Sequence, residues 1–155
     1  MAAAASGALW SAPLPAAPPQ AAIFSAAILE GGPGRRLLNF TIALSAAAAQ
    51  PVTLRWGTAN GTAIAGRDYV AASGVVSFAP GQTERTVGVW VIGDRFFEAD
   101  EQFSVRLSAP VNATLAPTAT VATGLIVNDD GLSRSRLAAA FASVETFNRN
   151  ARPRR

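Results

Sequence analysis

The residues best suited to chemistry in this chain are its acidic side chains, because histidine and cysteine are absent from all 155 residues. Without histidine the commonest general base and the commonest transition-metal ligand are missing. Without cysteine neither thiolate sites nor disulfides can form. Carboxylate and carbonyl oxygens remain, and these are the ligands that hard cations prefer. The composition therefore argues against zinc, copper and haem sites and leaves calcium or magnesium open.

Catalysis is the less favoured interpretation of the same acids. A carboxylate pair such as Asp68 and Glu98 could serve a glycosidase, which needs two carboxyl groups about 5–10 Å apart. However, the sequence offers no evident aromatic platform for a sugar, since Trp10 lies in an alanine- and proline-rich segment and Trp56 and Trp90 lie in expected strands. A nucleophilic triad lacks its histidine, and no glycine-rich phosphate loop precedes a helix. We therefore expect that the chain is not an enzyme.

The sequence around the acids predicts short β-strands separated by turn residues, and these strands must position the acids. In residues 37–44, apolar Leu38, Phe40, Ile42 and Leu44 alternate with smaller or polar residues, and a period of two indicates a half-buried strand. Seven strands without intervening helices predict an all-β, antiparallel β-sandwich, because a single open sheet would leave one apolar face in water. The expected strands are residues 23–29, 37–44, 52–56, 75–78, 85–92, 102–108 and 120–127.

Composition divides the chain into three segments. Residues 1–20 are rich in alanine and proline, carry no charged side chain and lack the positive start of a secretory signal, so we expect a linker there. Residues 21–131 hold seven arginines and nine acids and form the expected domain. Residues 132–155 hold six arginines and one glutamate, so the net charge of +3 comes from a basic tail. No apolar run is long enough to form a transmembrane segment.

The basic tail carries a helical pattern of its own. Leu137, Phe141 and Val144 recur at helical spacing, and no glycine or proline interrupts residues 135–147. This spacing predicts a short amphipathic helix, followed by disorder over residues 148–155. A basic tail could touch nucleic acid, but the rest of the chain is acidic and has no nucleic-acid motif. We therefore expect no specific nucleic-acid partner.

The acids are distributed unevenly between the two ends of the expected sandwich. Consecutive antiparallel strands reverse direction, so alternate connections lie at the same pole, and eight of the ten acids fall at one pole. Acids in loops are often merely solvated, but solvation does not explain why most of them lie at the same pole. Each close like-charge contact costs about 1 kcal/mol or more near a protein surface, which a bound cation would offset. The eight acids are Glu30, Asp68, Asp94, Glu98, Asp100, Glu101, Asp129 and Asp130.

Calcium suits this pole better than magnesium. It accepts about 6–8 oxygen ligands in flexible geometry, which loops and strand ends can supply, whereas magnesium demands a tighter octahedron and keeps its waters.

Five short motifs, in this order and at domain spacing, resemble the Calx-beta domain family. They are GTAIAGRDY at 61–69, GVVSFAPG at 74–81, IGD at 92–94, EADEQF at 98–103 and NDD at 128–130. The resemblance covers residues 23–130, roughly two thirds of the chain. It implies an immunoglobulin-like β-sandwich with calcium as its cofactor, bound at one pole. The implied metal ligands are Glu30, Asp68, Asp94, Glu98, Glu101, Asp129 and Asp130.

The same resemblance bears on two further positions. The backbone carbonyl of Phe96 is a candidate for an additional ligand. Asp100 is left out, because alternation should point it away from Glu101.

The sequence departs from the exchanger-type members of this family in ways that should weaken calcium binding. Asn128 stands where some members have a further aspartate, and Gly93 stands where they have another acid. Arg67 and Arg95 lie within the proposed ligand loops. If either arginine neutralises the acids, the chain is instead a metal-independent immunoglobulin-like spacer or interaction domain.

The family is found in sodium–calcium exchangers, in an integrin and in large bacterial surface and secreted proteins. The resemblance therefore implies a structural or adhesion module, extracellular or at the cell surface, in which calcium rigidifies one pole of the sandwich. The partners implied are calcium ions and neighbouring domains of a repeat array or another surface protein.

Overall fold

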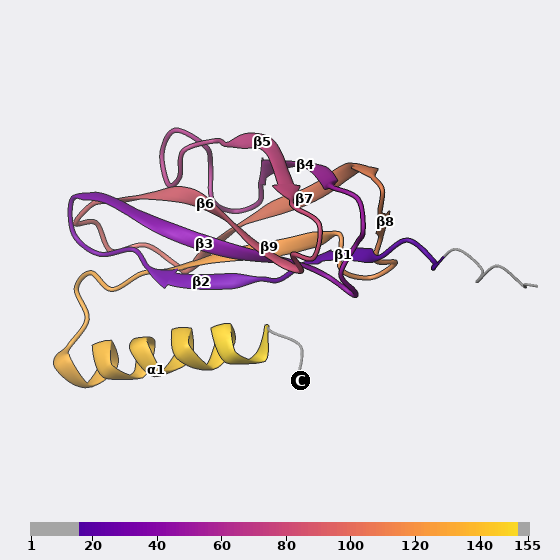
Figure 1. Cartoon of the computed structure of the whole chain (residues 1–155). Helices are drawn as coiled ribbons and strands as arrows, with labels where there is room; N and C mark the ends of the chain where they lie inside the picture. Colours follow the sequence, from indigo (N-terminus) through magenta and orange to yellow (C-terminus); the bar gives the residue numbers. More distant parts are fainter. Residues whose placement is uncertain (1–15, 152–155) are drawn as a thin grey trace, which may run out of the picture.

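Two β-sheets packed face to face form the body of the molecule in the computed structural model, with one helix lying along one side (Figure 1). The structure describes residues 16–151, so the expected linker up to residue 15, with Trp10, and residues 152–155 lie outside the described part. The four-stranded sheet has the order β6-β3-β1-β8, and the five-stranded sheet has the order β2-β9-β7-β4-β5. The predicted antiparallel β-sandwich is confirmed.

The strands of the four-stranded sheet are β1 (Gln20–Ile23), β3 (Gly34–Leu44), β6 (Glu84–Gly93) and β8 (Thr114–Leu115). The strands of the five-stranded sheet are β2 (Ala26–Leu29), β4 (Val52–Asn60), β5 (Ser73–Phe78), β7 (Glu101–Val111) and β9 (Val121–Val127). Strand β4 runs four residues beyond its predicted end, and β8 was not predicted.

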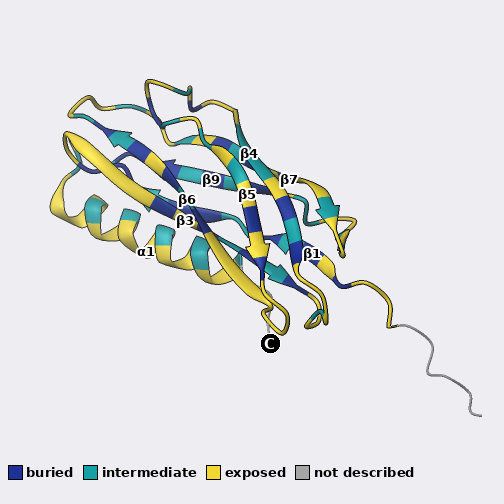
Figure 2. Ribbon diagram, turned by 45° about the horizontal axis from the view of Figure 1, so that its top comes forward, coloured by how far each residue is buried: buried dark blue, intermediate teal, exposed yellow. Residues whose placement is uncertain are grey.

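Alternation along the strands builds the core between the sheets, where buried and exposed positions follow one another (Figure 2). In β3 the four apolar residues at 38, 40, 42 and 44 are all buried, as their period of two predicts. Phe40 from one sheet meets Phe103 from the other edge to face, with ring centroids 5.9 Å apart. Tyr69 stacks on the same Phe103 ring at 4.3 Å. The loop that carries Tyr69 is thus anchored to the core.

The first predicted strand, residues 23–29, is divided between the two sheets. Strand β1 pairs antiparallel with β3, whereas β2 pairs parallel with β9. The chain changes sheet at Phe24 and Ser25, where the Ser25 hydroxyl accepts a hydrogen bond from the Thr123 N–H at 2.9 Å. The prediction of one continuous strand was wrong, because an apolar run gives no sign of which sheet each part joins.

The four acid-bearing connections meet at one end of the sandwich, as the count of strand directions predicted. The Gly31 N–H donates to Asp129 Oδ1 at 2.7 Å, which ties the end of β2 to the end of β9. Arg67, in the connection from β4 to β5, forms an ion pair with Glu98, in the connection from β6 to β7. We call this end the acidic pole and define it as residues 30–33, 61–69, 94–101 and 128–131.

Helix α1 (Arg134–Asn150) begins close to the acidic pole and lies alongside β2 (Figure 1). It confirms the predicted helix but extends further, so disorder from residue 148 onward was wrong for residues 148–150. Asn148 instead contacts the sheet, accepting from the Ala27 N–H at 2.6 Å and donating to the Ala27 carbonyl at 2.9 Å. Phe141 is 51% exposed, so it does not join Leu137 and Val144 on the inner face. No helix of the described residues is long and apolar enough to cross a membrane.

Candidate metal centre

A tight loop between β4 and β5 fixes the position of Asp68. Gly66 has a φ of +89°, a conformation that residues with a side chain rarely adopt, and its N–H donates to the Tyr69 carbonyl at 2.8 Å. The Asp68 carboxylate folds back on this loop, where Oδ2 accepts from the Ile64 N–H at 2.7 Å. Because Tyr69 is held in the core, Asp68 is buried yet directed toward the pole.

Asp68, Glu98 and Glu101 form the centre of the site. One carboxylate oxygen from each lies within 4.8 Å of those of the other two, although Asp68 is distant in sequence from Glu98 and Glu101. Burial and a hydrogen bond to Asp68 raise the pKa of Glu101 to about 7. The negative charges of Asp68 and Glu98 act in the same direction. A carboxyl that holds its proton this strongly marks a place where negative charge is crowded and a cation is favoured.

Arg67 covers this centre from the solvent side. Its Nη2 pairs with Glu98 Oε1, and its Nε lies 3.4 Å from Asp68 Oδ1. The Arg67 side chain is mostly exposed, whereas both carboxylates are largely covered. Arg95, the other arginine considered from the sequence, forms no ion pair within the described part of the chain. One guanidinium group therefore faces three carboxylates.

Glu30, at the end of β2, forms a second part of the site beside the first. Asn128 Nδ2 donates to Glu30 Oε2 at 3.3 Å and to the Phe96 carbonyl at 3.2 Å. Burial raises the pKa of Glu30, and the charges of Asp94 and Glu98 add to the rise, against the lowering effect of hydrogen bonds from Asn128 and the Asp94 backbone. The Asn128 amide thus sits between two oxygen atoms that were candidate ligands.

Two buried oxygens at the pole have no hydrogen-bond donor. These are Asn128 Oδ1 and Asp130 Oδ2. A buried acceptor without a partner costs free energy, so such atoms usually have a water or an ion beside them. Every side-chain ligand candidate at the pole offers oxygen, the donor type that calcium prefers. The residues present therefore fit a calcium ion.

The remaining acids of the pole use one oxygen each in a backbone hydrogen bond. Asp129 Oδ1 accepts from Gly31, Asp94 Oδ1 accepts from the Phe96 N–H at 2.7 Å, and Asp100 Oδ1 accepts from the Asn128 N–H at 3.1 Å. Asp100 contacts β9, whereas Glu101 turns into the cluster. These bonds hold the loops in place and leave the second oxygen of each carboxylate uncommitted among the described hydrogen bonds.

Two features of the pole were only partly foreseen in the sequence. Asn128 was noted as a missing aspartate, but its bridging amide depends on the side-by-side ends of β2 and β9. Gly93 was noted as a missing acid, and the structure gives a reason for its size. A Cβ atom there would lie only 2.8 Å from the carbonyl oxygens of Glu30 and Gly32 and even closer to that of Gly31. The close approach of these backbones requires glycine at this position.

Comparison with known proteins identifies relatives that share this domain. The sodium/calcium exchanger Calx of Drosophila melanogaster is 38% identical over 78 residues, which are 50% of this chain and 8% of the exchanger. Sodium/calcium exchanger 1 of Rattus norvegicus is 36% identical over 91 residues, 59% of this chain and 8% of the exchanger. The chain therefore spans only a small fraction of the length of these curated relatives.

Solved structures of related domains have a fold similar to that of this chain. The crystal structure of the apo-form Calx CBD1 domain superposes with a TM-score of 0.59 at 29% identity, covering 72% of this chain and 99% of that domain. The calcium binding domain CBD12 of CALX1.1 superposes with a TM-score of 0.61 at 30% identity, covering 70% of this chain and 46% of that chain.

The family model described as the Calx-beta domain matches residues 34–130, from the start of β3 to the last acid of the pole. This match covers more than half of the chain and includes six of the seven predicted ligand positions, all but Glu30. The chain belongs to the Calx-beta domain family.

Proposed function

We propose that this chain is a calcium-binding structural module, in which Ca²⁺ joins the loops of the acidic pole and makes them rigid. The observation that carries the proposal is the convergence of Asp68, Glu98 and Glu101, whose oxygens lie within 4.8 Å of one another while the Arg67 side chain that pairs with two of them is mostly exposed. Burial is the largest cause of the raised pKa of Glu101, and the neighbouring carboxylates of Asp68 and Glu98 add to it.

The three clustered carboxylates would be the main ligands. Glu30, Asp94, Asp129 and Asp130 would complete the site, with the Phe96 carbonyl as a further oxygen. Calcium supplies positive charge at the point where four chain segments meet. The protein's part is to hold the ligand loops: Gly66 turns the Asp68 loop, and Asp129 ties β2 to β9.

The expected affinity is low. Asn128 in place of an acid and Arg67 against the cluster both reduce the attraction for a cation. We expect a dissociation constant of roughly 10⁻⁴–10⁻³ M, the range of extracellular calcium modules. Such a site is filled outside the cell, which agrees with a surface or secreted protein in which the module stiffens a contact to a neighbouring domain or mediates adhesion.

The relatives support binding, not transport. One structural neighbour is described as a calcium binding domain, and this chain is similar to it over 70% of its own length. In the exchangers, the similar region is about 8% of the length of the exchanger. Ion exchange by those proteins therefore does not extend to this chain, and the family gives no reason to propose catalysis.

A metal-independent spacer is the second candidate, because Arg67 already pairs with Glu98 and lies near Asp68. In that case the guanidinium replaces the metal as the counter-charge. The two candidates differ in how the free energy of unfolding responds to calcium, because a ligand that binds only the native state stabilises it by mass action.

Isothermal titration of the chelator-treated protein with calcium tests the proposal. We expect saturable binding that is strongly reduced by Asp68→Asn, since this change removes a charge from the cluster and leaves its size unchanged. Glu84→Gln is the matched control, because Glu84 starts β6 at the opposite pole. No heat of binding at millimolar calcium would favour the arginine-neutralised spacer, whereas equal binding by both variants would show that Asp68 is not a ligand.

A further inference from the structure

The rim of the acidic pole exposes two adjacent aromatic side chains. Phe96 and Phe97 are 73% and 72% exposed, the highest values among the large apolar residues of the described part. They lie in the connection between β6 and β7, and Ile64, 43% exposed, belongs to the loop whose Arg67 pairs with Glu98. Single exposed apolar residues are normal, but contiguous ones at a loop tip mark an interaction surface.

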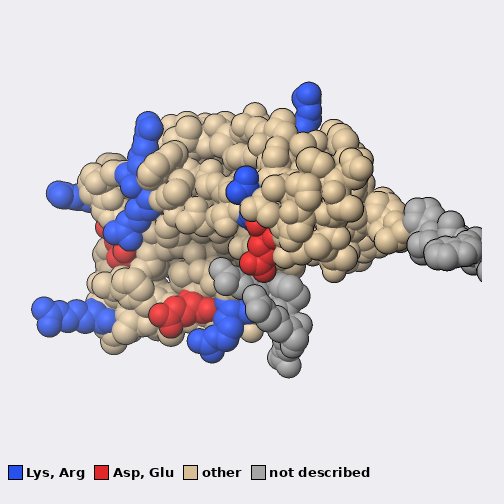
Figure 3. Space-filling view, viewed as in Figure 1, with Lys and Arg blue, Asp and Glu red and all other residues tan. Residues whose placement is uncertain are grey.

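Arginines surround this tip. Arg95 directly precedes Phe96, Arg67 pairs with Glu98 just after Phe97, and Arg35 and Arg36 start β3 opposite Ile92 and Val91 of β6. All four arginines are exposed, whereas Glu30 and Asp68 are buried. Figure 3 shows basic side chains projecting from this end of the sandwich, with acidic atoms closer to its body. The outermost charges of the pole are therefore positive.

We propose that the acidic pole, when it holds calcium, docks on membranes that contain anionic phospholipids. Phe96 and Phe97 insert at the level of the headgroups, and the surrounding arginines contact the phosphates. This inference rests on the proposed calcium site. Without calcium, the eight acids of the pole outnumber the four arginines in and beside it, so an anionic surface is repelled. Each bound calcium ion removes two of the four net negative charges, so the repulsion falls and the arginines can act on the surface.

A lipid surface fits this tip better than a folded protein partner. Aromatic side chains favour the interface between headgroups and acyl chains, and arginines beside them add electrostatic attraction to an anionic leaflet. Phe96 projects from a loop tip and lines none of the described grooves of the molecule, whereas Phe97 borders a groove toward α1 but is still 72% exposed. A deformable surface can accept such a projection without a complementary pocket.

Co-sedimentation of the full chain with vesicles of equimolar phosphatidylserine and phosphatidylcholine tests the proposal. We expect binding with calcium, little binding with chelator, and little binding to pure phosphatidylcholine in either buffer. Phe97→Ser should weaken vesicle binding by about tenfold or more, because an inserted phenylalanine loses its burial. Phe141→Ser is the matched control, because Phe141 is an exposed phenylalanine on α1 that lines none of the described grooves, and it should bind as wild type does.

The charge contribution is tested with a second pair of variants. Arg95→Gln should weaken vesicle binding by about fivefold, the effect of one cationic side chain near an anionic leaflet. Arg106→Gln, in the middle of β7, should have no effect. Calcium titration of Phe97→Ser and Arg95→Gln reports on the metal site separately from the membrane.

The outcomes separate the two proposals. Calcium binding without vesicle binding overturns the membrane inference alone, as does vesicle binding that Phe97→Ser and Phe141→Ser reduce equally. Vesicle binding that is equal with calcium and with chelator overturns the dependence on calcium. Failure of calcium to bind at all overturns the proposed function, and the membrane inference with it.

Discussion

The acidic pole and the contact between α1 and β2 both join parts of the chain that are distant in sequence, but they do so in opposite ways. At the pole, like charges crowd together and two buried oxygens lack a partner. At the helix, the Asn148 amide gives the Ala27 backbone both a donor and an acceptor. The pole therefore has oxygen atoms free to bind a ligand, whereas the backbone groups of Ala27 at the helix contact are already paired.

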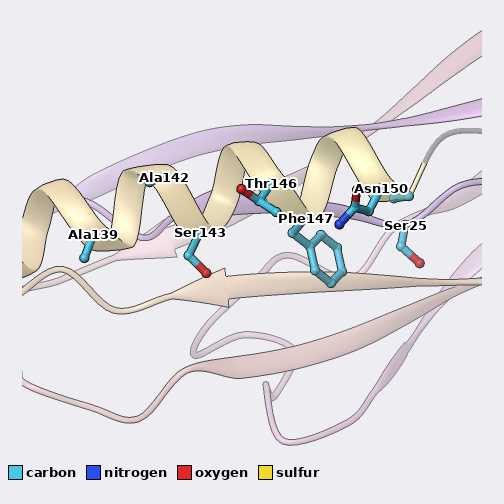
Figure 4. Close-up of a pocket in the computed structure, with 8 residues that line it drawn as sticks. Ser25, Ala139, Ala142, Ser143, Thr146, Phe147 and Asn150 are labelled. Carbon is cyan, nitrogen blue, oxygen red and sulfur yellow. The ribbon is translucent and has the colours of Figure 1, made fainter.

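The two regions also differ in how much apolar packing supports them. The pole rests on Tyr69 and Phe103, which are fully buried. Helix α1 has no fully buried residue, and an open groove of about 710 Å³ separates part of it from Ser25. Small residues such as Ala142 and Ser143 line the groove, into which Phe147 extends (Figure 4). The apolar packing beneath the pole is therefore tighter than the packing beneath the helix, and we expect the helix to contribute little to stability.

The largest expected effect is at Glu98. A ligand that binds only the native state adds about 2.7 kcal/mol at a hundredfold excess over its dissociation constant, and Glu98→Gln should remove most of that gain. Without calcium the same change should be neutral or stabilising, because it relieves repulsion with Asp68 and Glu101. Melting curves of wild type and variant, with chelator and with excess calcium, measure both effects. Equal destabilisation in the two buffers would mean that Glu98 serves Arg67 and not a metal.

Truncation after Gly131 should have the next largest effect. Removal of α1 exposes the part of β2 that it covers and leaves the Ala27 backbone without Asn148, which we expect to cost about 2 kcal/mol. Unfolding should nevertheless stay cooperative, and calcium should bind as before, because the predicted domain of residues 21–131 contains both sheets and the whole pole. Chemical denaturation and calcium titration of the truncated chain check this. A non-cooperative transition would show that the helix is part of the domain.

The sequence predicted which acids share one end of the sandwich, because both the charges and the strand directions can be deduced from it. Period-two patterns fixed the sequence of strand directions, and direction alone decides which acids share an end, as it did for Glu30 and Asp129. The helix contact could not be predicted in this way. Asn148 follows the apolar stripe and looks like the start of a polar tail, and nothing marks Ala27 as an outward-facing backbone at a sheet edge. Contacts between a side chain and a distant backbone leave no periodic signal.

The raised pKa of Glu101 should make both the stability of the protein and its calcium affinity depend on pH. This carboxyl has an ordinary value of 4.5 and titrates at about 7 in the folded protein, so the native state holds a proton that the unfolded state releases. Without calcium, stability should therefore fall as the pH rises from 4.5 to about 7. Calcium needs the ionised carboxylate, so its affinity should be about tenfold weaker at about pH 6 than at about pH 8.

Isothermal titration at both pH values measures this dependence, and Glu101→Gln provides the control. The variant cannot take up the proton, so its residual calcium affinity should change much less with pH. If wild type and Glu101→Gln respond equally, the proton that competes with calcium is on another group, and Glu101 is not the ligand that links the site to pH.

The smallest expected effect is at the helix contact, and it should not depend on calcium. Asn148→Ala removes two hydrogen bonds from the Ala27 backbone at an accessible sheet edge, where water can replace them in part, so we expect a loss of about 1 kcal/mol. Asn150→Ala is the matched control, because Asn150 lies in the same last turn and makes no described hydrogen bond to the sheet. The loss should be equal with chelator and with calcium, as measured by denaturation in both buffers. A loss that appears only with calcium would mean that metal at the pole tightens the docking of α1, since Asp130 and the start of the helix are separated only by residues 131–133. The two regions would then form one coupled unit, and the contrast between a conditional pole and a constant helix would be wrong.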